Sequence, residues 1–153
     1  MGTTLTGKNI STTYLGLLKT TDNAVIGSTA KRLTDGSGTD SPLFLSTSKL
    51  GIGVTPSVKL HIQESDVSVT PNAEHLLVVE KDGNSGIGIY SGSTSQGVLD
   101  FGDSSDANTG RILYTHNDNA MSFSTNGSAK MTIASTGQTK LNNYGSGTWI
   151  NSY

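Results

Sequence analysis

The sequence predicts an all-β protein, and three observations support this prediction. Short runs of residues alternate apolar and polar side chains with a period of two, which is the period of a half-buried β-strand. Clusters of Asn, Asp and Gly separate the runs and are typical of tight turns. Helical spacing occurs only in Ser11 to Lys19, a stretch too short to form a stable helix by itself. We therefore expect short strands joined by turns.

Two irregular stretches divide the chain. Asp35 to Ser41 contains Gly36 and Gly38 and is interpreted as a flexible connector between an amino-terminal segment, residues 1–40, and a β-rich body, residues 41–153. Ser65 to Ala73, which contains Pro71, is the second irregular stretch. No strict internal repeat is visible, so a solenoid of imperfect repeats stays open as an alternative to a simple meander.

The strands before residue 102 are predicted from short apolar runs, at residues 52–54, 58–62, 76–80, 87–90 and 96–101. The run Leu76 to Glu80 is expected to be more buried than the others. Lys81 to Asn84 is interpreted as the turn that leads into Ile87 to Tyr90.

A three-stranded meander is predicted from Gly110 to Ile133. One apolar stripe runs along each strand, made of Ile112, Tyr114 and His116, then Met121, Phe123 and Thr125, then Met131 and Ile133. The cluster at residues 117–119 tolerates positive φ and marks the first turn. Asn126-Gly127 is the signature of a two-residue type I′ hairpin and marks the second.

The composition points to association. Only 33% of the 153 residues are hydrophobic, and the low charge, 14% with a net charge of −2, separates the chain from typical disordered proteins. The apolar residues of the predicted strands are too few and too spread to close around one another in one copy; they are Ile52, Val54, Leu60, Ile62, Leu77, Val79, Ile112, Tyr114, Met121, Phe123, Met131 and Ile133. Packing of several copies would bury them.

Several classes of protein are disfavoured by composition. The chain has no cysteine, so it can form neither a disulfide framework nor a thiolate metal site. No apolar run approaches the roughly 18 residues of a membrane span, and the start at Met1 lacks the pattern of a signal peptide. Scattered Lys and Arg with a pI near 5.8 do not indicate a nucleic-acid partner.

Acidic residues offer two weak motifs. Asp100-Phe-Gly102 spells the magnesium-binding triplet of protein kinases, but the other kinase motifs are missing. Asp100, Asp103 and Asp106, or Asp35 with Asp40, could offer oxygen ligands to calcium, but the calcium-loop spacing with its terminal Glu is absent. Turn-forming roles are favoured for these aspartates, and no metal site is predicted.

Histidines and glycines give no clearer site. His61, His75 and His116 lie far apart and form no His-x-His pair, so each is expected to be a partly buried polar residue. Gly51-Ile-Gly53 and Gly86-Ile-Gly88 lack the third glycine and the helix of a nucleotide-binding loop, and are expected to allow close approach of backbones. No histidine accompanies a nucleophile elbow. We expect no catalytic residue, no cofactor and no enzyme.

Several phrases resemble tail-fibre and appendage proteins of bacteriophages. They are LSTSKLGIGVTPSVKLHI, Leu45 to Ile62; DFGDSSDANTGRILYTHNDNAMSFSTNGSAKMTI, Asp100 to Ile133; and the amino-terminal TLTGKNISTTYLGLLKTTDNAVI with DGSGTDSPLFLS. The resemblance implies an elongated homotrimer of short strands and β-meanders around a threefold axis, mounted on a virion. In that frame residues 1–40 are the attachment segment and residues 41–153 the fibre body. Many relatives end in an endosialidase-type intramolecular chaperone, whereas this sequence stops at GSGTWINSY.

The resemblance implies a structural virion protein that aids host attachment. Its expected partners are two further copies of itself, other virion proteins through the amino-terminal segment, and a glycan or protein of the host surface. A receptor- or glycan-binding module at a fibre tip is the alternative, because the rings of Tyr144, Trp149 and Tyr153 could stack on sugars as well as anchor the chain. A fragment of a glycan-degrading tailspike is the third possibility.

Overall fold

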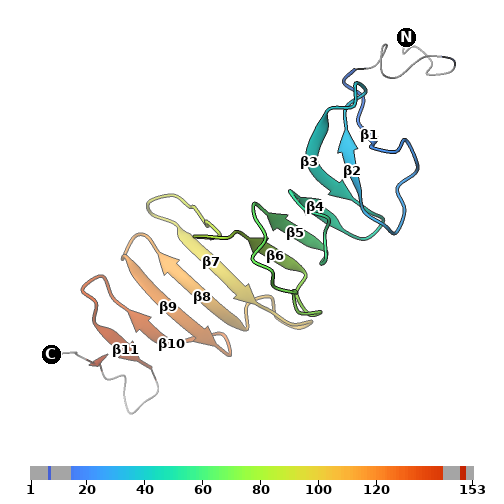
Figure 1. Cartoon of the computed structure of the whole chain (residues 1–153). Helices are drawn as coiled ribbons and strands as arrows, with labels where there is room; N and C mark the ends of the chain where they lie inside the picture. Colours follow the sequence, from blue (N-terminus) through green and yellow to red (C-terminus); the bar gives the residue numbers. More distant parts are fainter. Residues whose placement is uncertain (1–6, 8–14, 143–148, 151–153) are drawn as a thin grey trace, which may run out of the picture. The chain divides into compact units, whose positions relative to one another are not determined.

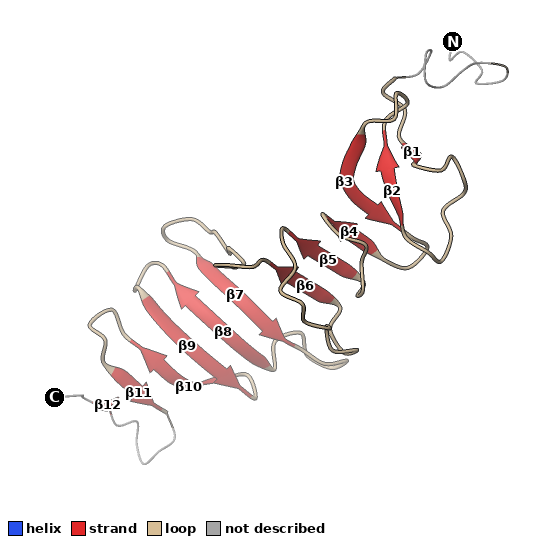
Figure 2. Cartoon of the chain, in the orientation of Figure 1, coloured by secondary structure: helices blue, strands red, loops and turns tan. Residues whose placement is uncertain are grey.

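The chain forms β-strands and loops, and no helix occurs in its described part (Figures 1 and 2). The computed structural model describes residues 7, 15–142, 149 and 150. Contacts divide the chain into unit 1, Met1–Ile87, and unit 2, Gly88–Tyr153. Each unit holds one six-stranded sheet, so the prediction of an all-β protein is confirmed.

The sheet of unit 1 combines antiparallel and parallel pairs. Its strands, in both chain order and spatial order, are β1 (Lys19–Thr20), β2 (Lys31–Thr34), β3 (Asp40–Leu45), β4 (Leu50–Ile52), β5 (Leu60–Gln63) and β6 (Leu77–Glu80). Strands β1 to β4 pair antiparallel, whereas β4, β5 and β6 pair parallel. The parallel pairs need crossover loops, residues 53–59 and 64–76, which run back along the sheet.

The sheet of unit 2 is an antiparallel meander. Its strands are β7 (Gln96–Phe101), β8 (Gly110–Thr115), β9 (Ala120–Thr125), β10 (Ser128–Ile133), β11 (Thr139–Leu141) and β12 (Trp149–Ile150). From β8 onwards, each strand pairs with the one before it in the sequence. The predicted strands at 96–101 and 110–133 are therefore confirmed, and β11 and β12 extend the meander beyond the prediction.

Turn chemistry explains why this meander could be predicted. Thr125 pairs with Ser128, so Asn126 and Gly127 form a two-residue loop. Their φ angles are 50° and 65°, and two positive values are what a type I′ turn requires. The turn at 116–119 also contains a residue with positive φ, Asn119 at 49°. Both predicted turns are confirmed.

The short strands of unit 1 are displaced from their predicted positions. The strand predicted at 52–54 is β4 at Leu50–Ile52, and the strand predicted at 58–62 is β5 at Leu60–Gln63. Gly53 has a φ of 82°, a value that ends an extended run, so Val54 lies outside the strand. Residues 57–59 form a bend that delays the start of β5.

Two predictions for residues 76–90 are wrong for the single chain. The strand predicted at 76–80 is present as β6, but it is not more buried than the others, because Leu76 and Leu77 are 65% and 49% exposed. Residues 87–90 form no strand, and Tyr90 is 96% exposed. A strand requires a paired neighbour, and none of the described residues pairs with this segment.

The stretch Asp35 to Ser41 was expected to be a flexible connector, but residues 35–39 are the loop of the β2–β3 hairpin, and Asp40 and Ser41 belong to β3. Thr34 pairs with Asp40, and the amide of Asp35 donates to the carbonyl of Thr39 at 3.1 Å. The side chain of Asp35 accepts from the Ser37 hydroxyl at 2.6 Å and from the Thr39 amide at 2.8 Å. These bonds order the loop. Of the stretch of helical spacing, residues 15–19 form no helix and Lys19 belongs to β1, whereas residues 11–14 lie outside the described residues.

The two units differ in what they bury. Among its described residues, unit 1 buries one large apolar side chain, Val58, together with polar groups that include His61 and Glu80. In unit 2 no residue from 88 to 142 is buried. The meander thus has regular hydrogen bonding without a hydrophobic core of its own.

Candidate functional site

The most extensive surface feature of unit 2 is one face of its sheet. Side chains alternate between faces along a strand, so the pairing register decides which residues share a face. Two rows cross the sheet on the same side, Leu99–Ile112–Phe123–Met131–Leu141 and Gly97–Tyr114–Met121–Ile133–Thr139. We call these residues, with Phe101, the apolar face of unit 2. It contains every stripe residue predicted for the meander except His116 and Thr125.

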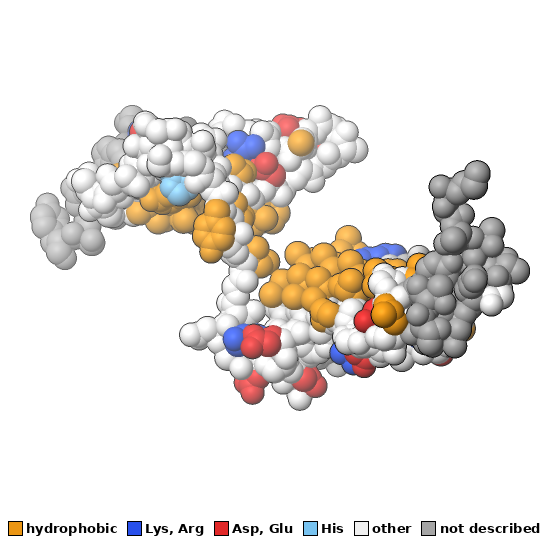
Figure 3. All heavy atoms as spheres, turned by 90° about the horizontal axis from the view of Figure 1, so that it is seen from above, with side chains coloured by type: hydrophobic (Ala, Val, Ile, Leu, Met, Phe, Trp, Pro, Cys, Tyr) orange, Lys and Arg blue, Asp and Glu red, His pale blue; other side chains and the backbone are white. Residues whose placement is uncertain are grey.

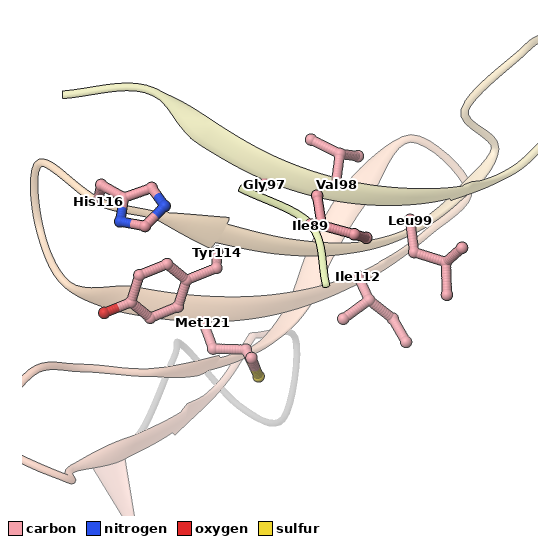
Figure 4. A pocket seen from close by; sticks show the side chains of 8 residues that line it. All are labelled: Ile89, Gly97, Val98, Leu99, Ile112, Tyr114, His116 and Met121. Carbon is pink, nitrogen blue, oxygen red and sulfur yellow. The ribbon is translucent and has the colours of Figure 1, made fainter. Parts of the chain in front are cut away.

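Solvent reaches this apolar face in the single chain. Leu99 is 49% exposed and Phe101 58%. Ile89 from the preceding loop joins Leu99, Ile112 and Met121 around a shallow concavity of about 320 Å³ (Figure 4). Figure 3 shows hydrophobic side chains gathered on the surface. Contiguous exposed apolar surface of this kind is typical of interaction or ligand-binding surfaces.

The opposite face of the same sheet is mostly polar, apart from the pair Val98 and Leu113. Arg111 and Asp100 face each other across β7 and β8, and Nε of Arg111 donates to Oδ1 of Asp100 at 2.6 Å. This hydrogen bond raises the pKa of Arg111 above its usual value. Ser124 is paired with Arg111, and Ser122 with Leu113. The sheet therefore presents one face suited to water and one suited to burial.

Unit 1 repeats the same division. Two aliphatic rows cross strands β3 to β6, Leu45–Leu50–Leu60–Leu77 and Leu43–Ile52–Ile62–Val79. None of these eight side chains is buried in the single chain. We call them the apolar face of unit 1. On the other face, the row Phe44–Gly51–His61–Val78 contains the buried residues Gly51 and His61, and the buried Pro56 lies next to Gly51.

The aspartates singled out in the sequence have local partners. Asp100, of the kinase-like triplet, pairs with Arg111. Asp103 accepts from the amides of Ser105 and Asp106 at 2.7 and 3.1 Å, and these bonds lower its pKa. Asp40 forms an ion pair with Arg32 at 2.8 Å. Within residues 15–142, no three acidic or histidine side chains are grouped to hold a metal ion.

The three histidines lie in different settings. His116 packs its ring edge-on against Tyr114, with ring centroids 5.0 Å apart. His75 donates its amide to the carbonyl of Asn72 at 3.0 Å and lines two surface pockets. His61 is buried on β5. The structure does not bring these histidines together.

His61 is the centre of a hydrogen-bonded cluster that the sequence did not predict. Its Nδ1 lies 3.1 Å from Oγ of Ser57, and its Nε2 lies 3.0 Å from Oε2 of Glu80. The other carboxylate oxygen of Glu80 accepts from the amide of Val67 at 2.7 Å. These two bonds, the amide first, lower the pKa of Glu80. We call Ser57, His61 and Glu80 the polar cluster of unit 1.

Only part of this cluster could be found from the sequence. Ser57 and His61 are four residues apart, on a loop and the strand that follows it, so their proximity is a local property. Glu80 comes from β6 and reaches His61 through the parallel pairing of β5 and β6, in which Gln63 faces Glu80. That pairing joins residues 17 positions apart and has no local signal.

The glycines of the first Gly-Ile-Gly stretch do permit close approach of backbones. A methyl group at Gly51 would collide with the carbonyl oxygen of Val54, and one at Gly53 with that of Gln63. At Gly86, in the second stretch, the space is open, whereas Gly88 lies beneath the ring of Tyr90. The prediction is confirmed for Gly51 and Gly53.

The aromatic residues near the carboxyl terminus are only partly described. Trp149 belongs to β12 and is paired with Lys140 of β11. Tyr144 and Tyr153 lie outside the described residues. A shared platform of the three rings therefore stays a prediction.

Any function of this chain has to be inferred from its own geometry, because no known protein was found to be similar to it. The described residues include no helix that is long and apolar enough to span a membrane. Searches against protein-family models, curated proteins and solved structures gave no match.

Proposed function

We propose that the chain is a structural subunit of a bacteriophage virion, a homotrimeric tail or head fibre or appendage that aids host attachment. The observation that carries the proposal is the pair of apolar faces on sheets that have almost no core of their own. Val58 is the one large apolar side chain buried in residues 15–142. A second copy supplies the missing layer, because identical one-sided sheets can cover one another around a symmetry axis.

The size of the faces supports this role. Six residues of strand are about 20 Å long and strands lie about 4.8 Å apart, so β7 to β11 present about 400 Å² in projection. Four shorter strands of unit 1 add about 200 Å² by the same spacing. The total is of the order of the roughly 800 Å² per partner in a standard interface. At about 25 cal/mol per Å², it contributes about 15 kcal/mol per copy before the costs of association.

The resemblance to tail-fibre and appendage proteins favours a trimer over other assemblies. The phrases that carry it overlap the strands of both apolar faces, β3 to β5 in unit 1 and the end of β7 with β8 to β10 in unit 2. In this proposal the polar face of unit 2, with Arg111 and Asp100, is turned to solvent. No catalysis is needed for such a role.

The mass in solution tests the proposal. Sedimentation velocity and light scattering should give about 48 kDa, three times the 15.9 kDa of one chain, with an elongated frictional ratio. Unfolding should shift to higher temperature as protein concentration rises, since folding and association are one event. A compact, folded 15.9 kDa species at micromolar concentration would contradict the proposal. It would favour the alternative, a small monomeric module that binds receptor glycans.

Attachment to the particle is proposed for residues 1–40. This segment contains β1 and β2, and β2 pairs with β3, so removing all of it would strip a strand from unit 1. Deleting residues 2–14 leaves every described strand in place. We expect particles to lose the protein while the purified variant keeps the mass of the full chain. Particles that still carry the shortened protein would contradict the assignment.

A further inference from the structure

We propose that Ser57 is an activated nucleophile that accepts acyl groups from small carboxylic esters. This activity goes beyond the structural role and does not depend on it. The inference rests on the polar cluster of unit 1, in which a serine, a histidine and a carboxylate form a continuous hydrogen-bonded chain. A nucleophile, a base and a group that orients the base are the parts that nucleophilic catalysis needs.

The cluster fixes which atom of His61 can act as the base. Glu80 accepts a hydrogen bond from the Val67 amide and lies 3.0 Å from Nε2, and its lowered pKa keeps it ionised at neutral pH. A carboxylate can only accept, so Nε2 of His61 carries the proton and Nδ1 is left with a lone pair. Ser57, at 3.1 Å, then donates its hydroxyl proton to Nδ1. The two ring nitrogens have exchanged the roles they play in chymotrypsin-like triads.

Burial and exposure are distributed as this chemistry requires. His61 and Glu80 are buried, so water does not compete for the imidazole and the carboxylate. Ser57 is exposed and lines a pocket of about 200 Å³ with Val58, His75 and Leu76. A pocket of that volume suits a short acyl group. The ammonium of Lys49, which donates to the carbonyl of Ser57 at 2.7 Å, lies at the same pocket.

Donors for the developing oxyanion are at hand. The amides of Val58 and Lys59 directly follow the nucleophile, and neither donates to any residue in the described part of the chain. The amide after the nucleophile supplies one oxyanion donor in α/β-hydrolases. Both residues border the pocket that Ser57 lines. We assign the stabilisation of the oxyanion to these two amides.

The reaction balances without any further reagent. Oγ of Ser57 bonds to the ester carbonyl carbon while its proton passes to Nδ1 of His61. The bond from that carbon to the leaving oxygen then breaks, and the alcohol takes the proton from Nδ1. Water attacks the resulting acyl-serine with His61 again as base, which releases the acid and restores the hydroxyl. Glu80 holds the imidazole in the required tautomer and is a positioning residue.

Reaction of the full-length protein with a fluorophosphonate, followed by peptide mass spectrometry, tests the proposal. We expect one adduct on Ser57 in the native protein, no adduct there after denaturation, and none on Ser48, an exposed serine of the same unit without a histidine partner. Hydrolysis of p-nitrophenyl acetate should fall to background in Ser57→Ala and stay unchanged in Ser48→Ala. A native protein without an adduct on Ser57, or with equal adducts on Ser48, would overturn the proposal.

The variant Glu80→Gln separates a reactive cluster from a merely structural one. The single side-chain oxygen of the introduced glutamine accepts from the Val67 backbone amide, so its side-chain nitrogen faces Nε2 of His61. That nitrogen donates to Nε2, and the ring proton of His61 moves to Nδ1. Ser57 then has no base, and labelling should slow about 100-fold or more. Circular dichroism and mass in solution should match the parent. A folded Glu80→Gln protein that labels at the parental rate would refute the assignment, and the native-versus-denatured comparison decides the matter if this variant does not fold.

Discussion

Substitution of Leu99 by aspartate gives the sharpest test of the apolar face of unit 2. Leu99 lies on this face, and its neighbour Val98 lies on the opposite, polar face of the same strand. In the single chain Leu99 is 49% exposed, and Val98 is less exposed than Leu99. A monomer would therefore tolerate Leu99→Asp at least as well as Val98→Asp. A trimer that packs the apolar face inward reverses this order.

The magnitude follows from the exposed part of the side chain. Full burial of a leucine side chain is worth about 1.5–3 kcal/mol, so covering the exposed half contributes about 1 kcal/mol per copy. Three copies lose about 3 kcal/mol, which corresponds to association weakened roughly 100-fold. Burial of three carboxylates around one axis adds a further penalty. The variant should then dissociate at protein concentrations at which the parent stays assembled.

Sedimentation velocity across a concentration series measures the effect. We expect Leu99→Asp to shift the mass from about three chains towards one, or to aggregate, and Val98→Asp to keep the parental mass. Equal masses for the two variants, or dissociation by Val98→Asp alone, would refute the assignment of the apolar face as the interface.

Three further predictions concern the stability of each copy. Gly127→Val places a β-branched residue at a φ of 65° and should cost about 1–2 kcal/mol per copy in chemical unfolding; an unchanged midpoint would contradict the strained turn. Gly51→Ala should lower the free energy of unfolding more than Gly86→Ala, because the new methyl group at residue 51 collides with backbone whereas the one at residue 86 has open space. Equal effects of the two variants would contradict the close approach of backbones at Gly51. The hydrogen bond from Lys31 lowers the pKa of Asp22 to about 2, so its stabilisation is complete above about pH 4 and lost as the pH falls to about 2. Lys31→Met should flatten that part of the acid-unfolding curve, and an unaltered curve would contradict it.

The strands that could be predicted are those in which local signals agree. From Gln96 to Ile133, alternation of side chains and two turns with positive φ specify the same antiparallel pairing. The pairing partners are also neighbours in the sequence, so no long-range information is needed. The charged and proline-containing strands β2 and β3 lack this alternation, and the loop between them resembles a connector.

Long-range pairing explains the remaining differences. Strands β4, β5 and β6 pair parallel across loops of 7 and 13 residues, residues 53–59 and 64–76, and nothing in a short window distinguishes that arrangement from hairpins. The same pairing brings Glu80 to His61, so the polar cluster could not be predicted from the sequence. The stripe 87–90 has strand-like alternation, but in the single chain it finds no partner among the described residues.

The sequential pairing of the meander has a consequence for how the protein is made. Because β7 to β11 each pair with the next strand along the chain, the contacts of this sheet are local and their formation needs little loop closure. The sheet can therefore form during synthesis, well before a nascent chain meets its neighbours. Such an intermediate carries its apolar face uncovered, and if the chain is the proposed trimer, the encounter of chains becomes the slow, concentration-dependent step. The yield of assembled protein should then depend on the competition between ordered assembly and aggregation. Slower synthesis at low temperature should favour assembly.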